Sequence, residues 1–280
     1  MTRVAVLLTC HNRADRTVGC LESLRRQADS TAASLQVVLV DAASTDGTAD
    51  IVAERFPDVT VLRRGDDLFW NGGMRVALAH AYGTDPDLYL WLNDDVELDH
   101  DATATLLCTH EELQRSRSEP CIVVGSTRDP ETADLTYGGV IRPDRRRPLH
   151  YERVEPSDRP QQVETMNGNC VLVPREIVAR IGNLAAAYTH GMGDYDYGHR
   201  ATRARGEVWI TPGTIGTCAR NPTVRPAASF DEHRRRATSP TGGLPPAEWF
   251  TFARRWAGPL WPMYAVSPYL RQFARWARSR

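Results

Sequence analysis

Residues 88–95 read LYLWLNDD, five apolar residues followed at once by an amide side chain and two carboxylates. A short continuous apolar run is typical of a strand that is buried on both faces of a sheet. Carboxylates directly after such a strand are costly to bury unless they are paired or bind a metal ion. Asn93, Asp94 and Asp95 therefore form either a binding site at the strand end or a polar turn that leads into a helix near residue 101.

Strand and helix signals alternate along the chain before this stretch. Apolar runs predict further strands over 4–8, 35–40 and 59–62, and helical spacing predicts helices over 14–27, 48–55 and 72–82. This order predicts an α/β fold with a doubly wound, mostly parallel sheet similar to the Rossmann arrangement. Ligands bind beyond the carboxyl ends of the strands in such sheets. The polar clusters 9–13, 41–48 and 93–95 all follow predicted strands.

The chain changes character twice after this region. Residues 126–165 are rich in Arg, Pro and Asp and show no periodicity, which predicts irregular loops. Regular patterns then return, and they predict a strand over 164–174, helices over 175–181 and 196–205, and a strand over 207–210. We expect three parts, residues 1–125, 126–224 and 225–280.

All 34 basic residues are arginines, and the chain contains no lysine. This composition excludes Schiff-base chemistry, the Walker A lysine and the lysine of the kinase β3 strand. Any phosphate must therefore be recognised by arginine, by backbone N–H groups or by a metal ion. Codon bias in a GC-rich genome also explains the composition, and the exclusions hold in either case.

The net charge of −1 hides an uneven distribution. Residues 225–280 carry 10 arginines against 3 acidic residues, net +7, whereas residues 1–224 carry 24 against 32, net −8. The tail also has two aromatic rows at helical spacing, Trp249, Phe252 and Trp256, and Tyr269, Phe273 and Trp276. Two interpretations remain open for residues 245–280. The aromatic side chains pack on the body of the protein or on a second subunit, or the helix lies on an anionic membrane surface.

The cysteines and the start of the chain indicate a cellular compartment. Six cysteines without CxxC spacing suggest small buried thiols in a reducing environment; they are Cys10, Cys20, Cys108, Cys121, Cys170 and Cys218. No signal-peptide pattern opens the chain, and no run of 18 apolar residues occurs. We expect a cytoplasmic protein, peripheral on the inner face of the membrane if the tail binds lipid.

Further polar residues are candidates for chemistry. Asp41 ends a predicted strand, and the following Ser44-Thr45-Asp46-Gly47 is a turn that can also simply start a helix. Asp194 and Asp196 lie two residues apart in a glycine-flanked stretch, which suits a general base but equally suits a helix N-cap with acidic first-turn residues. His11 and His190 are weaker candidates, since each is a single histidine near a loop.

Taken together, these segments resemble family 2 glycosyltransferases with the GT-A fold. Residues 4–13 and 38–48 resemble the opening of that family, and residues 90–96 resemble the strand that ends in its DXD motif. The other matching segments are 71–73, 167–175 and 193–200. The resemblance covers about residues 3–222 and is closest to the bacterial rhamnosyltransferase-like branch. It implies a nucleotide-sugar-binding half over 1–125, an acceptor-binding and catalytic half over 126–224, and a basic aromatic helical tail.

The resemblance also implies roles for individual residues. The donor, a UDP- or dTDP-linked sugar, would be bound by Thr9, His11, Arg13, Asp41, Ser44, Asn71, Gly72, Gly73, Asn93 and Asp94. Asp95 would hold Mn²⁺ or Mg²⁺. The acceptor side would include Asn167, Gly168 and His190. Asp194, with Asp196 behind it, would deprotonate the acceptor hydroxyl in a single, inverting displacement.

The chain departs from the family pattern at three positions. Asn93 stands where the DXD motif begins with Asp, and residues 212–218 lack the metal-binding His that often follows the strand near 207–210. Metal binding is therefore expected to be weaker or to be completed by diphosphate and water. Gly193 replaces the usual Glu before Asp194, which favours Asp194 as the base.

The acceptor stays open among glycans, lipid-linked molecules and small molecules, and we expect no nucleic acid partner. Two alternative functions are a catalytically inactive nucleotide-sugar-binding scaffold and a nucleotidyltransferase. A nucleotidyltransferase generally needs a Gly-rich loop with a basic residue directly after the first strand, which residues 9–13 lack.

Overall fold

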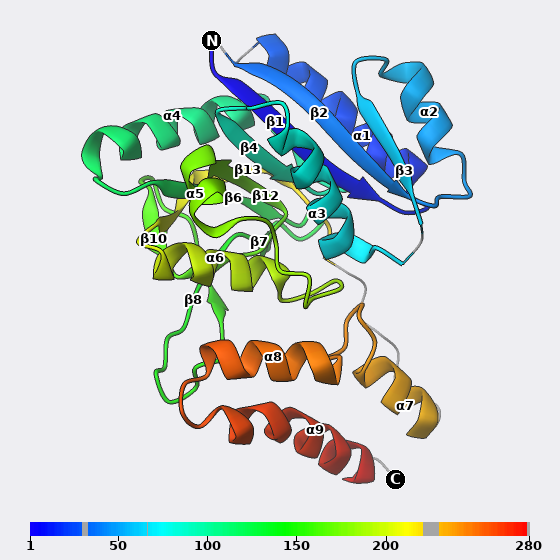
Figure 1. Cartoon of the computed structure of the whole chain (residues 1–280), viewed down its shortest axis with the longest axis vertical. Helices are drawn as coiled ribbons and strands as arrows, with labels where there is room; N and C mark the ends of the chain where they lie inside the picture. Colours follow the sequence, from blue (N-terminus) through cyan, green and yellow to red (C-terminus); the bar gives the residue numbers. More distant parts are fainter. Residues whose placement is uncertain (30–32, 66, 221–229, 279–280) are drawn as a thin grey trace.

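A mixed sheet forms the centre of the computed structural model, which describes residues 1–29, 33–65, 67–220 and 230–278 (Figure 1). The strand order is β10-β13-β6-β12-β4-β1-β2-β3, with β5 paired to β13 and β7 paired to β6. The strands are β1 (Arg3–Cys10), β2 (Ser34–Ala42), β3 (Thr60–Arg64), β4 (Leu88–Leu92), β5 (Glu97–Leu98), β6 (Cys121–Arg128), β7 (Leu135–Tyr137), β10 (Gln161–Val163), β12 (Cys170–Pro174) and β13 (Glu207–Thr217).

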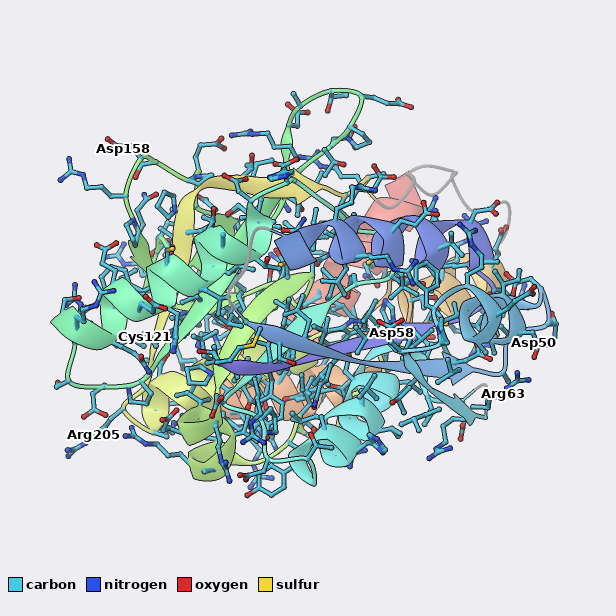
Figure 2. The ribbon with its side chains drawn as sticks, turned by 90° about the horizontal axis from the view of Figure 1, so that it is seen from above. Asp50, Asp58, Arg63, Cys121, Asp158 and Arg205 are labelled. Atoms are coloured by element: carbon cyan, nitrogen blue, oxygen red, sulfur yellow. The ribbon has the colours of Figure 1, made fainter. Side chains whose placement is uncertain are left out.

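Helices cover both faces of this sheet (Figure 2). One face carries α1 (Ala14–Arg25), α2 (Thr48–Arg55) and α4 (Ala102–Ser116), and the other carries α3 (Phe69–Tyr82), α5 (Arg175–Ile181) and α6 (Gly193–Arg203). Successive residues of β1 alternate between the two cores, so Val6 packs on one side and Leu7 on the other. The predicted doubly wound arrangement is confirmed.

The four strands at the N-terminal end of the chain are parallel, as predicted, but β12 runs antiparallel to β4 and to β6. Five residue pairs join β12 to β4, from Cys170 opposite Leu92 to Pro174 opposite Leu88. The turn that enters β12 is therefore placed at the carboxyl end of β4. There the N–H of Asn93 donates to the carbonyl of Asn169 at 2.9 Å.

The prediction of irregular loops over 126–165 holds only in part. This region contains short strands, among them β7, β10, β8 (Gly139–Ile141) and β9 (Glu152–Arg153), and the last two join β11 (Thr165–Met166) in a separate small sheet. Strands of two or three residues are too short to produce a recognisable alternation in the sequence. The single strand predicted over 164–174 is accordingly two strands, which belong to different sheets.

The bounds of two later elements, one helix and one strand, also differ from prediction. The helix predicted over 196–205 begins at Gly193, so Asp194 and Asp196 lie in the first turn of α6 and not in a loop. The strand predicted over 207–210 extends to Thr217.

Five of the six cysteines are buried, as predicted, but Cys108 is exposed on α4.

The described part of the tail contains three helices, α7 (Phe230–Ala237), α8 (Pro246–Trp256) and α9 (Trp261–Arg278). α8 lies beneath α6, and α9 lies beyond α8 (Figure 1). Trp249, Phe252 and Trp256 are buried in a cluster that includes Tyr188. Packing on the body is therefore the correct interpretation for α8. The predicted boundary at 224/225 and the side chain of Trp276 fall outside the described residues.

One buried carboxylate fastens α8 to α6. Asp196 is fully buried and accepts hydrogen bonds from Arg200 Nε (2.8 Å), Arg255 Nη1 (2.9 Å), Trp256 Nε1 (3.0 Å) and Tyr188 OH (3.2 Å). We call these five residues the tail anchor. With both carboxylate oxygens occupied and no exposed surface, Asp196 does not support the predicted role behind the catalytic base. Its contacts assign it to holding the tail.

The tail anchor predicts a large effect of Asp196→Ala on stability. Removing one member of a buried ion pair costs ~3–5 kcal/mol, and we expect a loss of about 3 kcal/mol because Arg200 and Arg255 can regain some water. Urea denaturation of the full chain measures the difference. Glu111→Ala, which breaks an exposed pair with Arg115, serves as the control and should cost less than about 0.5 kcal/mol. Equal losses for the two variants would contradict the anchor.

Candidate active site

The acidic cluster after β4 is held by Arg13 at the N-cap of α1 and by Arg16 in its first turn. Arg13 Nη1 donates to Asp94 Oδ1 and to Asp95 Oδ2, each at 3.0 Å, and Arg16 Nη1 lies 3.7 Å from the same oxygen of Asp95. Burial raises the pKa of Asp94 to about 6, against the lowering effect of Arg13. The arginines therefore compensate two carboxylates that would otherwise repel each other.

These carboxylates leave two oxygens for a cation. Asp94 Oδ2 is buried without a hydrogen-bond partner, and Asp95 Oδ1 lies 3.5 Å from the thiol of Cys218. Carboxylate oxygens are the ligands that Mg²⁺ and Mn²⁺ prefer, so the residues fit a divalent ion. Among the residues that the structure describes, no group of three His, Cys, Asp or Glu side chains is arranged to hold a metal. A bound ion would therefore need ligands from diphosphate or water.

The ends of β1 and β2 are linked into one polar rim. Asp41 is buried and accepts from the N–H of Ser44 at 3.3 Å and from the thiol of Cys10 at 3.6 Å. His11 Nδ1 lies 2.6 Å from the carbonyl oxygen of Ala42. The structure thus brings the predicted donor-binding residues of both strands together, beside the arginine–carboxylate cluster.

Helix α3 packs closely against this rim. A Cβ atom on Gly73 would lie 2.0 Å from Thr9 Oγ1, so only glycine permits the contact, whereas Gly72 meets only Leu68 of its own helical turn. Asn71 is fully buried, and its amide donates to the carbonyls of Ala185 (3.0 Å) and Tyr188 (2.6 Å). Direct donor contact, as predicted for Asn71, is therefore not supported. Its contacts position the segment that leads into α6.

Asp194 lies in the first turn of α6, where its carboxylate accepts two backbone hydrogen bonds. Oδ2 accepts from the N–H of Gly168 at 3.0 Å, and Oδ1 accepts from the N–H of Tyr195 at 2.8 Å. Burial nevertheless raises the pKa of Asp194 to about 6, because no cation offsets the lost solvation. A carboxyl group with a pKa near neutrality is suited to accept a proton from a substrate.

Trp70 connects the two halves of the site, and sequence analysis missed it. Its Nε1 donates to Asn93 Oδ1 at 2.7 Å, and its ring covers Gly168, where a Cβ would lie 2.5 Å from the indole carbons. Gly168 in turn binds Asp194, so one side chain links the strand that carries the carboxylates to the turn that holds the candidate base. The predicted start of α3 at residue 72 left Trp70 outside the helix and hid this signal.

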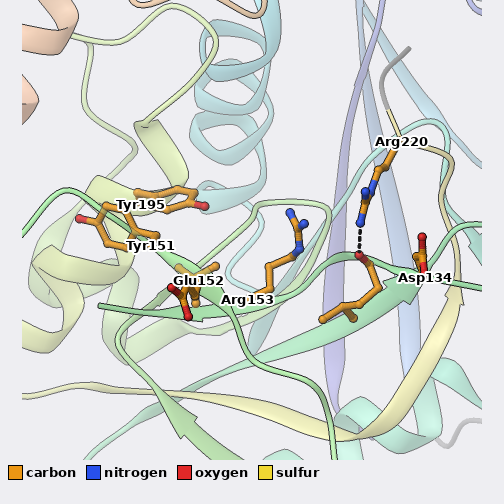
Figure 3. Close-up of a pocket in the computed structure, with 8 residues that line it drawn as sticks. Asp134, Tyr151, Glu152, Arg153, Tyr195 and Arg220 are labelled. Atoms are coloured by element: carbon orange, nitrogen blue, oxygen red, sulfur yellow. Dashed lines mark hydrogen bonds between the residues drawn. The ribbon is translucent and has the colours of Figure 1, made fainter. Parts of the chain in front are cut away.

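A cavity of about 500 Å³ is lined by Tyr195, the residue that follows Asp194 in α6 (Figure 3). Tyr151 and Tyr195 line it with perpendicular rings, and Arg153 and Arg220 line it with guanidinium groups. Asn167 adjoins this cavity, since its Nδ2 donates to the hydroxyl of Tyr195 at 3.3 Å. Aromatic faces together with polar groups are suited to bind a sugar ring.

His190 lies nearer to the donor side than predicted. Burial and the positive charge of Arg13 lower the pKa of His190, which favours the neutral form of its imidazole. Its Nδ1 is buried and has no hydrogen-bond partner, and its ring meets that of Phe69 edge to face, with centroids 6.4 Å apart.

Comparison with known proteins places this site in a family. The model of the family described as "Glycosyl transferase family 2" matches residues 5–182. The chain belongs to this family. The match spans β1 to the end of α5 and thus includes the arginine–carboxylate cluster and the turn at Gly168. The membership also removes nucleotidyltransferase as an interpretation.

Two curated relatives of this family 2 glycosyltransferase come from Mycobacterium tuberculosis, strains CDC 1551 / Oshkosh and ATCC 25618 / H37Rv. Both are described as N-acetylglucosaminyl-diphospho-decaprenol L-rhamnosyltransferase, and each is 28% identical over 200 residues. The alignment covers 62% of this chain and 63% of each relative, which is less than two thirds of their length.

Solved structures show the fold of the glycosyltransferase independently. The mannosyltransferase PcManGT from Pyrobaculum calidifontis, in complex with GDP-Man and Mn²⁺, matches with a TM-score of 0.54 at 20% identity, over 99% of this chain and 76% of that one. TarS 1–349 from S. aureus, in complex with UDP-GlcNAc, matches with a TM-score of 0.55 at 13% identity, over 91% and 71%. Both neighbours are GT-A enzymes, and the GT-A fold predicted from the sequence is confirmed.

The contact between Trp70 and Gly168 predicts a specific energetic coupling. Gly168→Ala should cost ~1–3 kcal/mol of unfolding free energy, because the added methyl group overlaps the indole ring. Combining it with Trp70→Ala should cost less than the sum of the two single variants by ~0.5–3 kcal/mol. Urea denaturation measures this cycle. Gly191→Ala is the control, since a Cβ there meets no atom within 4 Å, and additive losses at 70 and 168 would refute the contact.

Proposed function

We propose that this protein transfers a sugar from a nucleoside diphosphate sugar to an acceptor hydroxyl, with Asp194 as the general base. The observation that carries the proposal is the carboxyl group of Asp194. It has a raised pKa and is tied through Gly168 and Trp70 to the strand end that carries Asp94 and Asp95. Family membership supports the same reaction class.

The residues at the ends of β1, β2 and β4 would bind the donor. Asp41 would accept hydrogen bonds from the base or ribose, and Arg13, which contacts Asp95, would bind the diphosphate. A divalent ion at Asp95, when bound, would neutralise charge on the diphosphate leaving group. The Mn²⁺ in the complex of the mannosyltransferase neighbour supports this assignment. Because the chain contains no lysine, Arg13 and Arg16 supply the positive charge beside Asp94 and Asp95 instead.

The transfer step needs one base. The acceptor hydroxyl gives its proton to the Asp194 carboxylate while its oxygen forms a bond to the anomeric carbon. The bond from that carbon to the diphosphate oxygen breaks, and the electron pair leaves with the diphosphate. A single displacement of this kind inverts the anomeric configuration. Trp70 and the Gly168 N–H would hold the base in position during the step.

For the substrates we propose a dTDP- or UDP-linked donor and a lipid-linked acceptor. The curated relatives are described as N-acetylglucosaminyl-diphospho-decaprenol L-rhamnosyltransferases, which supports a lipid-linked acceptor. The cavity lined by Tyr151 and Tyr195 would bind the sugar of the acceptor. A thermal-shift screen of nucleoside diphosphate sugars with Mn²⁺ and Mg²⁺ would identify the donor, because a bound ligand stabilises the folded state.

The first prediction of this proposal concerns Asp194→Asn. Without a proton acceptor, transfer should fall by ~10²–10⁴-fold, while donor affinity stays within about twofold, because the amide keeps the shape of the side chain. Transfer is measured by release of the nucleoside diphosphate, and affinity by calorimetry. Transfer by the variant at a rate comparable to wild type would refute the role of Asp194.

The pH profile of the wild type provides the control for this variant. Below its raised pKa Asp194 is protonated and cannot accept a proton, so kcat should rise with pH through about 6 and then level off. The residual activity of Asp194→Asn should lack this limb. A limb that persists in the variant would assign the titration to another group.

The second prediction concerns the proposed metal ligand. Asp95→Ala should weaken donor binding in the presence of Mn²⁺ about tenfold or more, equal to ~1.4 kcal/mol, and should reduce the difference between binding with and without the ion. Calorimetry measures both affinities. Asp101→Ala removes an exposed carboxylate six positions further along and should leave them unchanged. An unchanged metal-dependent affinity in Asp95→Ala would contradict the assignment.

A further inference from the structure

Helix α9 is attached to the protein by hydrogen bonds that involve Trp249, Tyr264 and Tyr269, and the hydroxyl of Tyr264 donates to the carbonyl of Arg146 at 2.6 Å. The indole N–H of Trp249 on α8 donates to the carbonyl of Ala265 at 3.0 Å, and Ala265 is fully buried. The hydroxyl of Tyr269 donates to the carbonyl of Leu244 at 2.9 Å. α8 is itself fixed to α6 by the tail anchor, so α9 has a defined orientation at the outer end of the molecule (Figure 1).

Helix α9 also exposes a row of large apolar residues. Leu260, directly before the helix, is 61% exposed, and Met263, Val266 and Leu270 are 56%, 42% and 64% exposed. Their spacing of three, three and four residues places them along one stripe of the helix. Single exposed apolar side chains are common, but a continuous row marks an interaction surface. We call these four residues the apolar row.

The charged residues of the sequence segment that carries the apolar row all have the same sign. Residues 249–280 contain six arginines and neither Asp nor Glu. Arg271, Arg275 and Arg278 follow each other at spacings of four and three, so their positions form a second stripe next to the apolar row. A second copy of the chain on this face would bring like charges together. An anionic surface would compensate them.

We propose that the apolar row inserts into the headgroup region of an anionic lipid bilayer, with the neighbouring arginine positions facing the lipid phosphates. Amphipathic helices with cationic flanks bind in this way, parallel to the membrane plane. None of the described helices combines the length and the apolar character that a membrane span requires. The tail anchor joins α8 to α6, and α9 is bound to α8, so the orientation of α9 also fixes that of α6, which carries Asp194. If the proposed transfer to a lipid-linked acceptor is correct, this surface would hold the enzyme at the membrane that contains the acceptor.

The test is co-sedimentation of the full chain with vesicles of phosphatidylglycerol and phosphatidylcholine, compared with vesicles of phosphatidylcholine alone. We expect about tenfold or stronger binding to the anionic vesicles, weakened by salt, and a loss of about tenfold or more in Met263→Glu/Leu270→Glu. Both positions are exposed, so the variant should fold. Gln114→Glu/Ser118→Glu adds the same charge at exposed positions near the end of α4 and should bind as wild type.

Three results would overturn the proposal. The first is equal binding of the wild type to both kinds of vesicle. The second is unchanged binding of Met263→Glu/Leu270→Glu to the anionic vesicles. The third is a wild-type dimer that this variant converts to a monomer, measured by light scattering, while vesicle binding stays the same. The last result would show that the row contacts a second copy. The assay contains no sugar donor, so its outcome is independent of the proposed transfer reaction.

Discussion

The antiparallel pairing of β12 with β4 is the constraint on which the site depends. Because Cys170 pairs with Leu92, the turn before β12 lies at the carboxyl end of β4, beside Asn93. That turn presents the N–H of Gly168 to Asp194. A parallel strand at this place would carry its entry turn to the opposite edge of the sheet. The acidic cluster and the candidate base would then lie far apart.

Environment gives different roles to two aspartates that lie two residues apart. Asp196 meets two guanidinium groups, an indole N–H and a hydroxyl, so its charge is fully compensated and it joins the tail to the body. Asp194 accepts hydrogen bonds from the backbone N–H groups of Gly168 and Tyr195, and burial raises its pKa. The same contrast explains why one position suits acid–base chemistry and the other suits structure. It also couples the site to the tail, because both residues lie in the first turn of α6.

Local patterns in the sequence were enough to predict the central strands and the polar residues at their ends. Arg13 and Asp95 follow the buried strands β1 and β4, Asp41 lies near the end of β2, and the topology brings all three to one edge. The tail anchor could not be predicted in this way, because Arg255 and Trp256 reach Asp196 from about 60 positions further along the chain. Trp70 was missed for a similar reason, because its role depends on its contact with Gly168, which is distant in the sequence but adjacent in the structure. Short strands over 126–165 left too few residues to show a period.

In our proposal, Asp94 and Asp95 share one edge of the sheet with the base Asp194, and all three carboxylates act on the same bound donor and acceptor. A crystal structure of the full chain with Mn²⁺ and its nucleoside diphosphate sugar tests this claim most directly. We predict that the diphosphate binds between Arg13 and Asp95 and that the anomeric carbon lies on the side of Asp194. A donor bound away from these residues, or a sugar that Asp194 cannot approach, would contradict it.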